Sequence, residues 1–168
     1  MKTKSLLIAV LALAVSASVS AKGHFTTKKD RLIDAEGKTF VIKGINNPHA
    51  WFGEKAYDAL DHIAAINANC VRIVWQTRGK TEDLERIIKR CIELEMIPMV
   101  ELHDVTGNPK KERLLDMAGY YAREDVRKML QKYERYLLVN IANEWGNHEV
   151  TTEHWLDSYT AAVKVLRD

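Results

Sequence analysis

Apolar residues along this chain alternate between two spacings. Short apolar runs, typical of buried strands, are separated by longer stretches in which apolar residues recur every three or four positions, as on one face of a helix. The runs predict strands at residues 40–45, 70–75, 97–102 and 136–142. The longer stretches predict helices at residues 57–68, 82–95, 112–134 and 152–167.

Local turn and capping signals refine these limits. Residues 32–39, with Glu36 and Gly37 at the turn, form a hairpin-like segment before the first strand. Thr81 directly precedes the second helix and is its predicted N-cap. Gly119 predicts a break within the third helix, because glycine weakens a helix interior.

The regular alternation of strand and helix predicts right-handed β/α units and a parallel sheet. A doubly wound sheet would show the same alternation. A barrel is favoured because polar side chains gather where each strand ends, and this rim carries the active sites of β/α barrels. We therefore predict an α/β fold, a parallel β/α (TIM) barrel with about its first four units present. The rim residues are Asn46, Asn47, His49, Arg72, Trp75, His103, Asp104, Asn143, Glu144 and Trp145.

The fourth predicted strand has an informative alternation. Its apolar positions 137, 139 and 141 are predicted to face the helices, whereas Asn140, Ala142 and Glu144 are predicted to face the barrel interior. Core packing does not explain a polar interior row that ends in a carboxylate. Glu144 can act as a general acid if partial burial raises its pKa.

Three tryptophans, Trp51, Trp75 and Trp145, lie near the same rim. The flat face of an indole suits the apolar face of a sugar ring. Packing in the core is the alternative for each of them.

The first 21 residues have the layout of a secretory signal peptide. Lys2 and Lys4 precede an apolar run at residues 6–15, and small residues at 19–21 offer a cleavage site. That run is too short to span a bilayer, which takes about 20 residues. A buried N-terminal helix is the alternative. We expect a secreted protein, extracellular or periplasmic, with residues 22–168 as its domain and no membrane association after cleavage.

The charge balance argues against nucleic acid or anionic lipid as a partner. The chain has 25 basic and 23 acidic residues, and the predicted signal peptide removes two lysines and no acidic residue. No net field then remains to attract a polyanion. A hydrophobic content of 46%, with four tryptophans and six tyrosines, indicates a globular domain.

Cys70 and Cys91 are the only cysteines. An exported protein could join them in a disulfide, and two buried free thiols are the alternative. Their spacing fits no zinc site, and HExxH, Walker and GxGxxG motifs do not occur in the sequence. We expect no metal and no cofactor, which also weakens the case for a barrel hydrolase acting on non-sugar substrates.

Four ordered motifs carry a resemblance to a known family. They are GINNPHAW at 44–51, NCVRIV at 69–74, VELHDVTG at 100–107 and VNIANEWG at 139–146. Together they resemble glycoside hydrolase family 5, and most closely its bacterial endo-β-1,4-mannanase branch. The resemblance runs from about residue 25 to the end of the chain. It implies cleavage of internal β-1,4 linkages of mannan or glucan by a retaining two-carboxylate mechanism.

The resemblance also implies a role for each rim residue. Glu144 would be the acid/base, and Asn143 would bond the sugar 2-hydroxyl, a contact that strengthens in the transition state. Arg72 would keep the nucleophilic carboxylate ionised. The other predicted substrate-binding or supporting residues are His103, His49, Trp51 and Trp145.

Some of these side chains have a second interpretation. His49 and His103 could instead support the site from behind the residues that touch substrate. Glu101 has interior parity and is expected to pair with Arg72 for structural reasons.

One part of the family pattern has no counterpart here. Retaining hydrolysis needs a second carboxylate roughly 5–5.5 Å from the first, and in this family it comes from the seventh strand. Removing the predicted signal peptide leaves 147 residues, whereas an eight-unit barrel takes about 250. The sequence could be truncated, could be a half-barrel that pairs with another half, or could close in an unforeseen fold.

Either open edge of such a half-barrel would expose unpaired backbone, an aggregation hazard. We expect the chain alone to hydrolyse nothing and the missing C-terminal half-barrel to be a candidate partner beside the polysaccharide. A non-catalytic carbohydrate-binding or interaction module derived from such a barrel is the alternative function.

Overall fold

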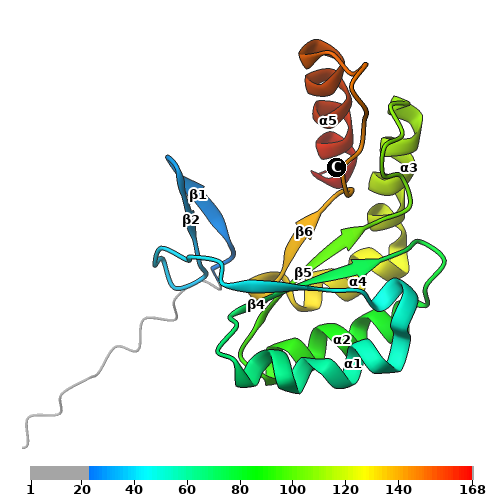
Figure 1. The fold of residues 1–168 in the computed structure, drawn as a ribbon. Helices are drawn as coiled ribbons and strands as arrows, with labels where there is room; N and C mark the ends of the chain where they lie inside the picture. Colours follow the sequence, from blue (N-terminus) through cyan, green and yellow to red (C-terminus); the bar gives the residue numbers. More distant parts are fainter. Residues whose placement is uncertain (1–22, 168) are drawn as a thin grey trace, which may run out of the picture.

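The computed structural model describes residues 23–167, and its centre is a four-stranded parallel sheet (Figure 1). The strands lie in chain order, β3–β4–β5–β6. Their bounds are β3 Gly44–Asn47, β4 Cys70–Trp75, β5 Ile97–Leu102 and β6 Leu138–Asn140. Five helices connect and follow them: α1 His49–Ala65, α2 Thr81–Glu93, α3 Lys111–Ala122, α4 Glu124–Lys132 and α5 Thr152–Arg167. This arrangement is half of a parallel β/α barrel, as predicted.

The alternation of side chains separates the hydrophobic core from the barrel interior. Val71, Ile73 and Trp75 of β4 join one buried core with Val100 and Leu102 of β5 and with apolar residues of the helices. Figure 1 shows these helices on one side of the sheet. Residues of the opposite parity point away from that core, because successive side chains of a strand face opposite sides.

The first strand begins later than the sequence predicts. Residues 40–43 precede β3, and Val41 and Ile42 are 64% and 46% exposed. The side chain of Asn69 holds this segment: its amide donates to the Val41 carbonyl at 2.9 Å, and its Oδ1 accepts from the Lys43 N–H at 2.7 Å. A side chain therefore replaces the backbone ladder that the apolar run predicted.

Three predicted helix limits are wrong for local reasons. Helix α1 begins at His49 and is interrupted at Gly53 (φ 44°); residues 49–56 lack helical periodicity because Trp51 and Phe52 are exposed. The chain breaks at Arg123, which is extended, and stays helical through Gly119. Thr81 is not an N-cap. It is the first residue of α2 and its hydroxyl donates to Asp125.

The amino-terminal part of the described chain is an antiparallel hairpin of β1 Thr26–Lys28 and β2 Arg31–Ile33. The turn predicted around Gly37 is a second turn that follows it, in which Asp34 Oδ1 accepts from the backbone of Glu36 and Lys38. The predicted signal peptide lies outside the described residues. Within 23–167, no helix has the length and apolar character needed to cross a membrane.

Both cysteines are buried free thiols in the structure. Burial raises the pKa of Cys70 to about 11 and that of Cys91 to about 12. Thiols held in their protonated form are poor nucleophiles. They act here as small apolar residues of the core.

Candidate active site

A network of polar side chains crosses the carboxyl ends of the strands. Arg72 of β4 lies 3.4 Å from Glu101 of β5, Nη2 to Oε2, and donates to Asn143 Oδ1 at 2.5 Å. Asn143 follows β6, so three neighbouring strands deliver these groups to one place. The predicted pairing of Arg72 with Glu101 is confirmed.

His103 extends the network towards the first unit of the barrel. Its Nδ1 is 3.1 Å from Glu101 Oε1, and its Nε2 is 3.5 Å from the side-chain nitrogen of Asn143. The ring of Trp51, 54% exposed, meets the imidazole edge-on, with 5.0 Å between ring centroids. The structure thus brings together Arg72, His103, Asn143 and Trp51, which the sequence predicted as site residues.

Glu101 is the charged centre of this network. Its side chain has no exposed surface, and its carboxylate is shared by Arg72 and His103. Burial raises the pKa of Glu101, while first the Arg72 guanidinium and then His103 oppose that rise. A buried carboxylate with two cationic or donor partners fixes both of them in place. It also holds the guanidinium of Arg72 on the interior face of the sheet.

Glu144 follows Asn143 on the same loop. Its backbone is left-handed (φ 42°), and its carbonyl accepts from the Gly107 N–H at 2.9 Å. The side chain is exposed and lines an open cleft of about 460 Å³ with Asn147, Trp155 and neighbouring loop residues. Among residues 23–167 no hydrogen bond or ion pair holds this carboxylate. The described part of the chain therefore does not bury the Glu144 carboxyl group.

The interior row predicted for the fourth strand is wrong in part. Strand β6 ends at Asn140, and the strict alternation ends with it. Ala142 belongs to the buried core, and Asn143, one position on, reaches the Arg72 network. The turn at Glu144 has a left-handed backbone that a strand pattern cannot anticipate.

Five of the predicted rim residues are buried: Asn47, His49, Trp75, Asn143 and Trp145. Trp145 is 5% exposed, and its indole N–H donates to the Lys110 carbonyl at 3.0 Å. His49 is 4% exposed, and its Nε2 lies 3.2 Å from the amide nitrogen of Asn47. Trp145 therefore supports the loop that carries Glu144, and His49 supports the start of α1. Little of either ring is open to a sugar.

The Asn47 contact fixes the protonation of His49. The Asn47 amide nitrogen also donates to the Ala56 carbonyl, so it faces Nε2 as a donor and Nε2 must accept. Burial lowers the pKa of His49 to about 4, from 6.5 for a free imidazole. Protonation of Nε2 would place its N–H opposite the N–H of the Asn47 amide, with no acceptor between them.

This lowered pKa predicts acid sensitivity. Because the folded pKa lies below the unfolded one, the stabilisation is complete above pH 6.5 and is lost as the pH falls towards 4. We expect about 2 kcal/mol of the free energy of unfolding to be lost between pH 7 and pH 5. Urea unfolding should show a much weaker dependence in His49→Gln, whereas His62→Gln, at an exposed site, should keep it. An unchanged pH dependence in His49→Gln would contradict this origin.

The sheet and the rim residues all fall within one family match. Residues 33–168 match Cellulase (glycosyl hydrolase family 5). The chain belongs to glycosyl hydrolase family 5. This family 5 chain is 35% identical, over 151 residues, to a mannan endo-1,4-β-mannosidase of Salipaludibacillus agaradhaerens, covering 86% of this chain and 47% of that protein.

Solved structures give the same result. The catalytic domain of the mannanase from Streptomyces sp. SirexAA-E superposes with a TM-score of 0.78 at 31% identity, covering 94% of this chain and 52% of that one. The mannohexaose complex of the Thermomonospora fusca β-mannanase gives 0.75 at 29% identity, covering 86% and 51%. The chain spans about half the length of the curated relatives it matches.

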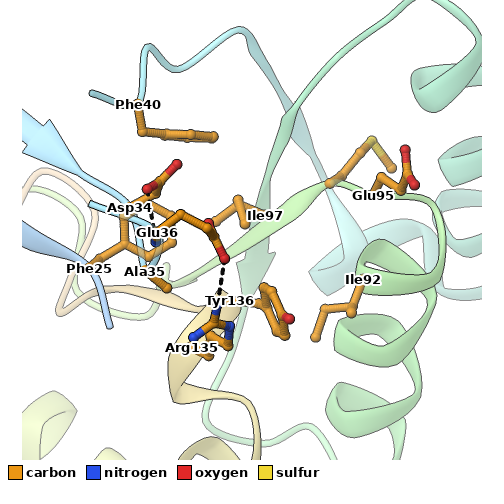
Figure 2. Close-up of a pocket in the computed structure, with 11 residues that line it drawn as sticks. Phe25, Asp34, Ala35, Glu36, Phe40, Ile92, Glu95, Ile97, Arg135 and Tyr136 are labelled. Atoms are coloured by element: carbon orange, nitrogen blue, oxygen red, sulfur yellow. Dashed lines mark hydrogen bonds and ion pairs between the residues drawn. The ribbon is translucent and has the colours of Figure 1, made fainter. Parts of the chain in front are cut away.

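The family 5 chain has a second cavity at the other end of the sheet (Figure 2). It measures about 390 Å³, lies between the hairpin segment and the start of β5, and is flanked by the ion pair of Arg135 with Glu36. Phe25 and Phe40 line it and meet edge-on. The amino ends of barrel strands contribute to stability, whereas active sites occupy the carboxyl ends. This cavity is therefore separate from the rim that carries Glu144.

Within the described residues, no group of three His, Cys, Asp or Glu side chains is arranged to hold a metal ion.

One residue of the site was missed by the sequence analysis. Thr106 accepts a hydrogen bond from the Asn143 amide at 2.9 Å. It lies inside the VELHDVTG motif, but a lone threonine in a loop gives no periodic or chemical signal of its own.

Proposed function

We propose that this chain supplies the acid/base half of the active site of an endo-β-1,4-mannanase. The observation that carries the proposal is the network that joins Arg72, Glu101 and His103 to Asn143, the residue that directly precedes Glu144 in the chain. It places a fixed amide and a guanidinium at the end of the sheet where barrel enzymes act, and the exposed Glu144 side chain follows on the same loop. Such a constellation suits cleavage of a bond between sugars.

The proposed chemistry needs two carboxylates. Glu144 protonates the glycosidic oxygen as the bond breaks, and then removes a proton from the water that releases the sugar. The nucleophilic carboxylate comes from a part of the barrel beyond this chain. The Asn143 amide binds the sugar 2-hydroxyl, and the Arg72 guanidinium faces the position of the nucleophile and favours its ionised form.

Mannan is the proposed substrate. Three of the four curated relatives are mannan endo-1,4-β-mannosidases by name, and the fourth is a β-mannanase/endoglucanase. One solved relative, the Thermomonospora fusca β-mannanase, is known in complex with mannohexaose and with mannotriose. Trp51 is half-exposed beside His103 and offers an aromatic surface at the rim. We also propose export of the protein, on the basis of the signal-like residues 1–21.

A hybrid enzyme tests the proposal. In this hybrid, residues 23–168 replace the matching segment of the Salipaludibacillus agaradhaerens mannosidase, so that the relative supplies the other half. We expect the hybrid to release reducing ends from β-1,4-mannan faster than from carboxymethylcellulose, and residues 23–168 alone to release none. A folded hybrid without mannanase activity, or turnover by the isolated chain, would contradict the proposal. Binding of mannan without hydrolysis by the hybrid would instead favour a carbohydrate-binding module.

A further inference from the structure

Two loops of the rim lie against each other like a short antiparallel ladder. The loop after β5 meets the loop after β6 through an isolated bridge between Thr106 and Trp145. The Gly107 N–H donates to the Glu144 carbonyl at 2.9 Å, and the Gly146 N–H donates to the Asn108 carbonyl at 3.0 Å. The segment carrying Asn143 and Glu144 is therefore held by the neighbouring β/α unit as well as by its own strand.

The Thr106 hydroxyl is the only side-chain hydroxyl in the described chain that bonds Asn143. Its Oγ1 accepts from the Asn143 amide nitrogen at 2.9 Å and lies 3.5 Å from the Asn143 carbonyl oxygen, to which the hydroxyl can donate. One hydroxyl thus contacts both the side chain and the backbone of the same residue.

Arg72 fixes the orientation of the amide. A guanidinium can only donate, so the oxygen of Asn143 must face Arg72 and the nitrogen must face Thr106. With both ends of the amide engaged, the second N–H of Asn143 has a defined direction. His103 Nε2, at 3.5 Å, lies on that side.

We infer that Thr106 is a positioning residue for the acid/base loop. It orients the Asn143 amide for the sugar 2-hydroxyl and, with Gly107, holds Glu144 in its left-handed conformation. Gly107 is itself left-handed (φ 74°), so both residues of the Gly107–Glu144 hydrogen bond have backbone conformations that most residues avoid. The inference rests on the proposed function and adds a residue that does not itself touch substrate.

The test uses Thr106→Val in the hybrid enzyme, which removes the hydroxyl and nearly preserves the volume. We expect kcat on mannan to fall by roughly 10- to 100-fold, because small misplacements of catalytic groups cost about that much. KM should change by less than about threefold, because the contact acts mainly in the transition state. Thr106→Ser keeps the hydroxyl and should restore kcat to within about threefold. Loss of kcat in both variants, or in neither, would overturn the inference.

A double-mutant cycle separates positioning from general destabilisation. If Thr106 acts through Asn143, Thr106→Val should have almost no further effect on kcat in an Asn143→Ala background. Multiplicative losses would contradict a shared pathway. A fully active Glu144→Gln hybrid would contradict the proposed function itself. If the Glu144→Gln hybrid is inactive but the Thr106→Val hybrid has the kinetics of the unsubstituted enzyme, only the inference about Thr106 is contradicted.

A measurement on the chain alone does not depend on turnover. The Asn143 side-chain amide protons, followed by NMR, should exchange slowly with solvent in the unsubstituted chain and in Thr106→Ser. They should exchange faster in Thr106→Val. Equal exchange in all three would show that the hydroxyl does not hold the amide.

Discussion

Glu144→Gln in the hybrid enzyme is expected to lower kcat on mannan by about 10²- to 10⁴-fold, the range that a general acid/base supplies. The substitution keeps the size of the side chain and removes its charge and its ability to give and take a proton. Since the Glu144 side chain is exposed and its carboxylate has no hydrogen-bond or ion-pair partner among residues 23–167, folding should be unaffected. Initial rates on β-1,4-mannan measure the effect.

Glu149→Gln is the matched control. Glu149 lies on the same loop and is also exposed; its backbone N–H donates to Asn147 Oδ1 at 2.9 Å, and its carboxylate accepts from the Asn147 side chain at 3.4 Å, a bond that the glutamine oxygen can also accept. It makes the same change in charge a few residues away. We expect its kcat to stay within about twofold of the unsubstituted hybrid. Equal losses in both variants would mean that the loop responds to charge and that Glu144 has no special role.

Arg72→Met is expected to lower the free energy of unfolding of the chain by about 3–5 kcal/mol. It leaves the fully buried carboxylate of Glu101 without its main partner. Urea unfolding measures the loss. The control is Arg113→Met, which breaks an exposed ion pair with Asp116 and should cost no more than about 1 kcal/mol.

Two further results identify the buried charge as the cause. Adding Glu101→Gln to Arg72→Met should recover about half or more of the loss, because the orphaned charge is then removed. The loss should also shrink as the pH falls. Burial raises the pKa of Glu101, and Arg72 opposes this rise. Without Arg72 the folded state therefore favours the protonated form of Glu101. The stability of the Arg72→Met variant is then greater at low pH and is lost as the pH rises. A pH-independent loss would indicate lost packing.

The sequence predicted the central strands and the pairing of the site well. The limits of β4 and β5 agree with the apolar patterns, because these strands are packed over most of their length. Those of α5 agree as well, although Ser158 and Ala162 are its buried residues and much of the helix is exposed. The Arg72–Glu101 pair followed from strand parity alone. Both inferences depend on regular backbone, in which a residue number fixes a direction.

The remaining features depend on contacts that are distant in sequence. The start of β3 is shifted by the Asn69 side chain, 26 residues from Lys43. The hydroxyl that accepts from the Asn143 amide belongs to Thr106, 37 residues away. Strand β6 ends at Asn140, and the alternation that predicted the interior row ends there. These features follow from how loops meet in space, for which periodicity carries no information.

Leaving-group dependence tests the role of Glu144 most directly. A dinitrophenyl β-mannobioside has a leaving group that departs without a proton, so its first step does not need a general acid. We predict that Glu144→Gln in the hybrid lowers kcat/KM on mannan by about 10²- to 10⁴-fold, but on this substrate by less than about tenfold, with an initial burst of dinitrophenolate. Equal losses on both substrates, or a loss on neither, would contradict the assignment of the acid/base to this chain.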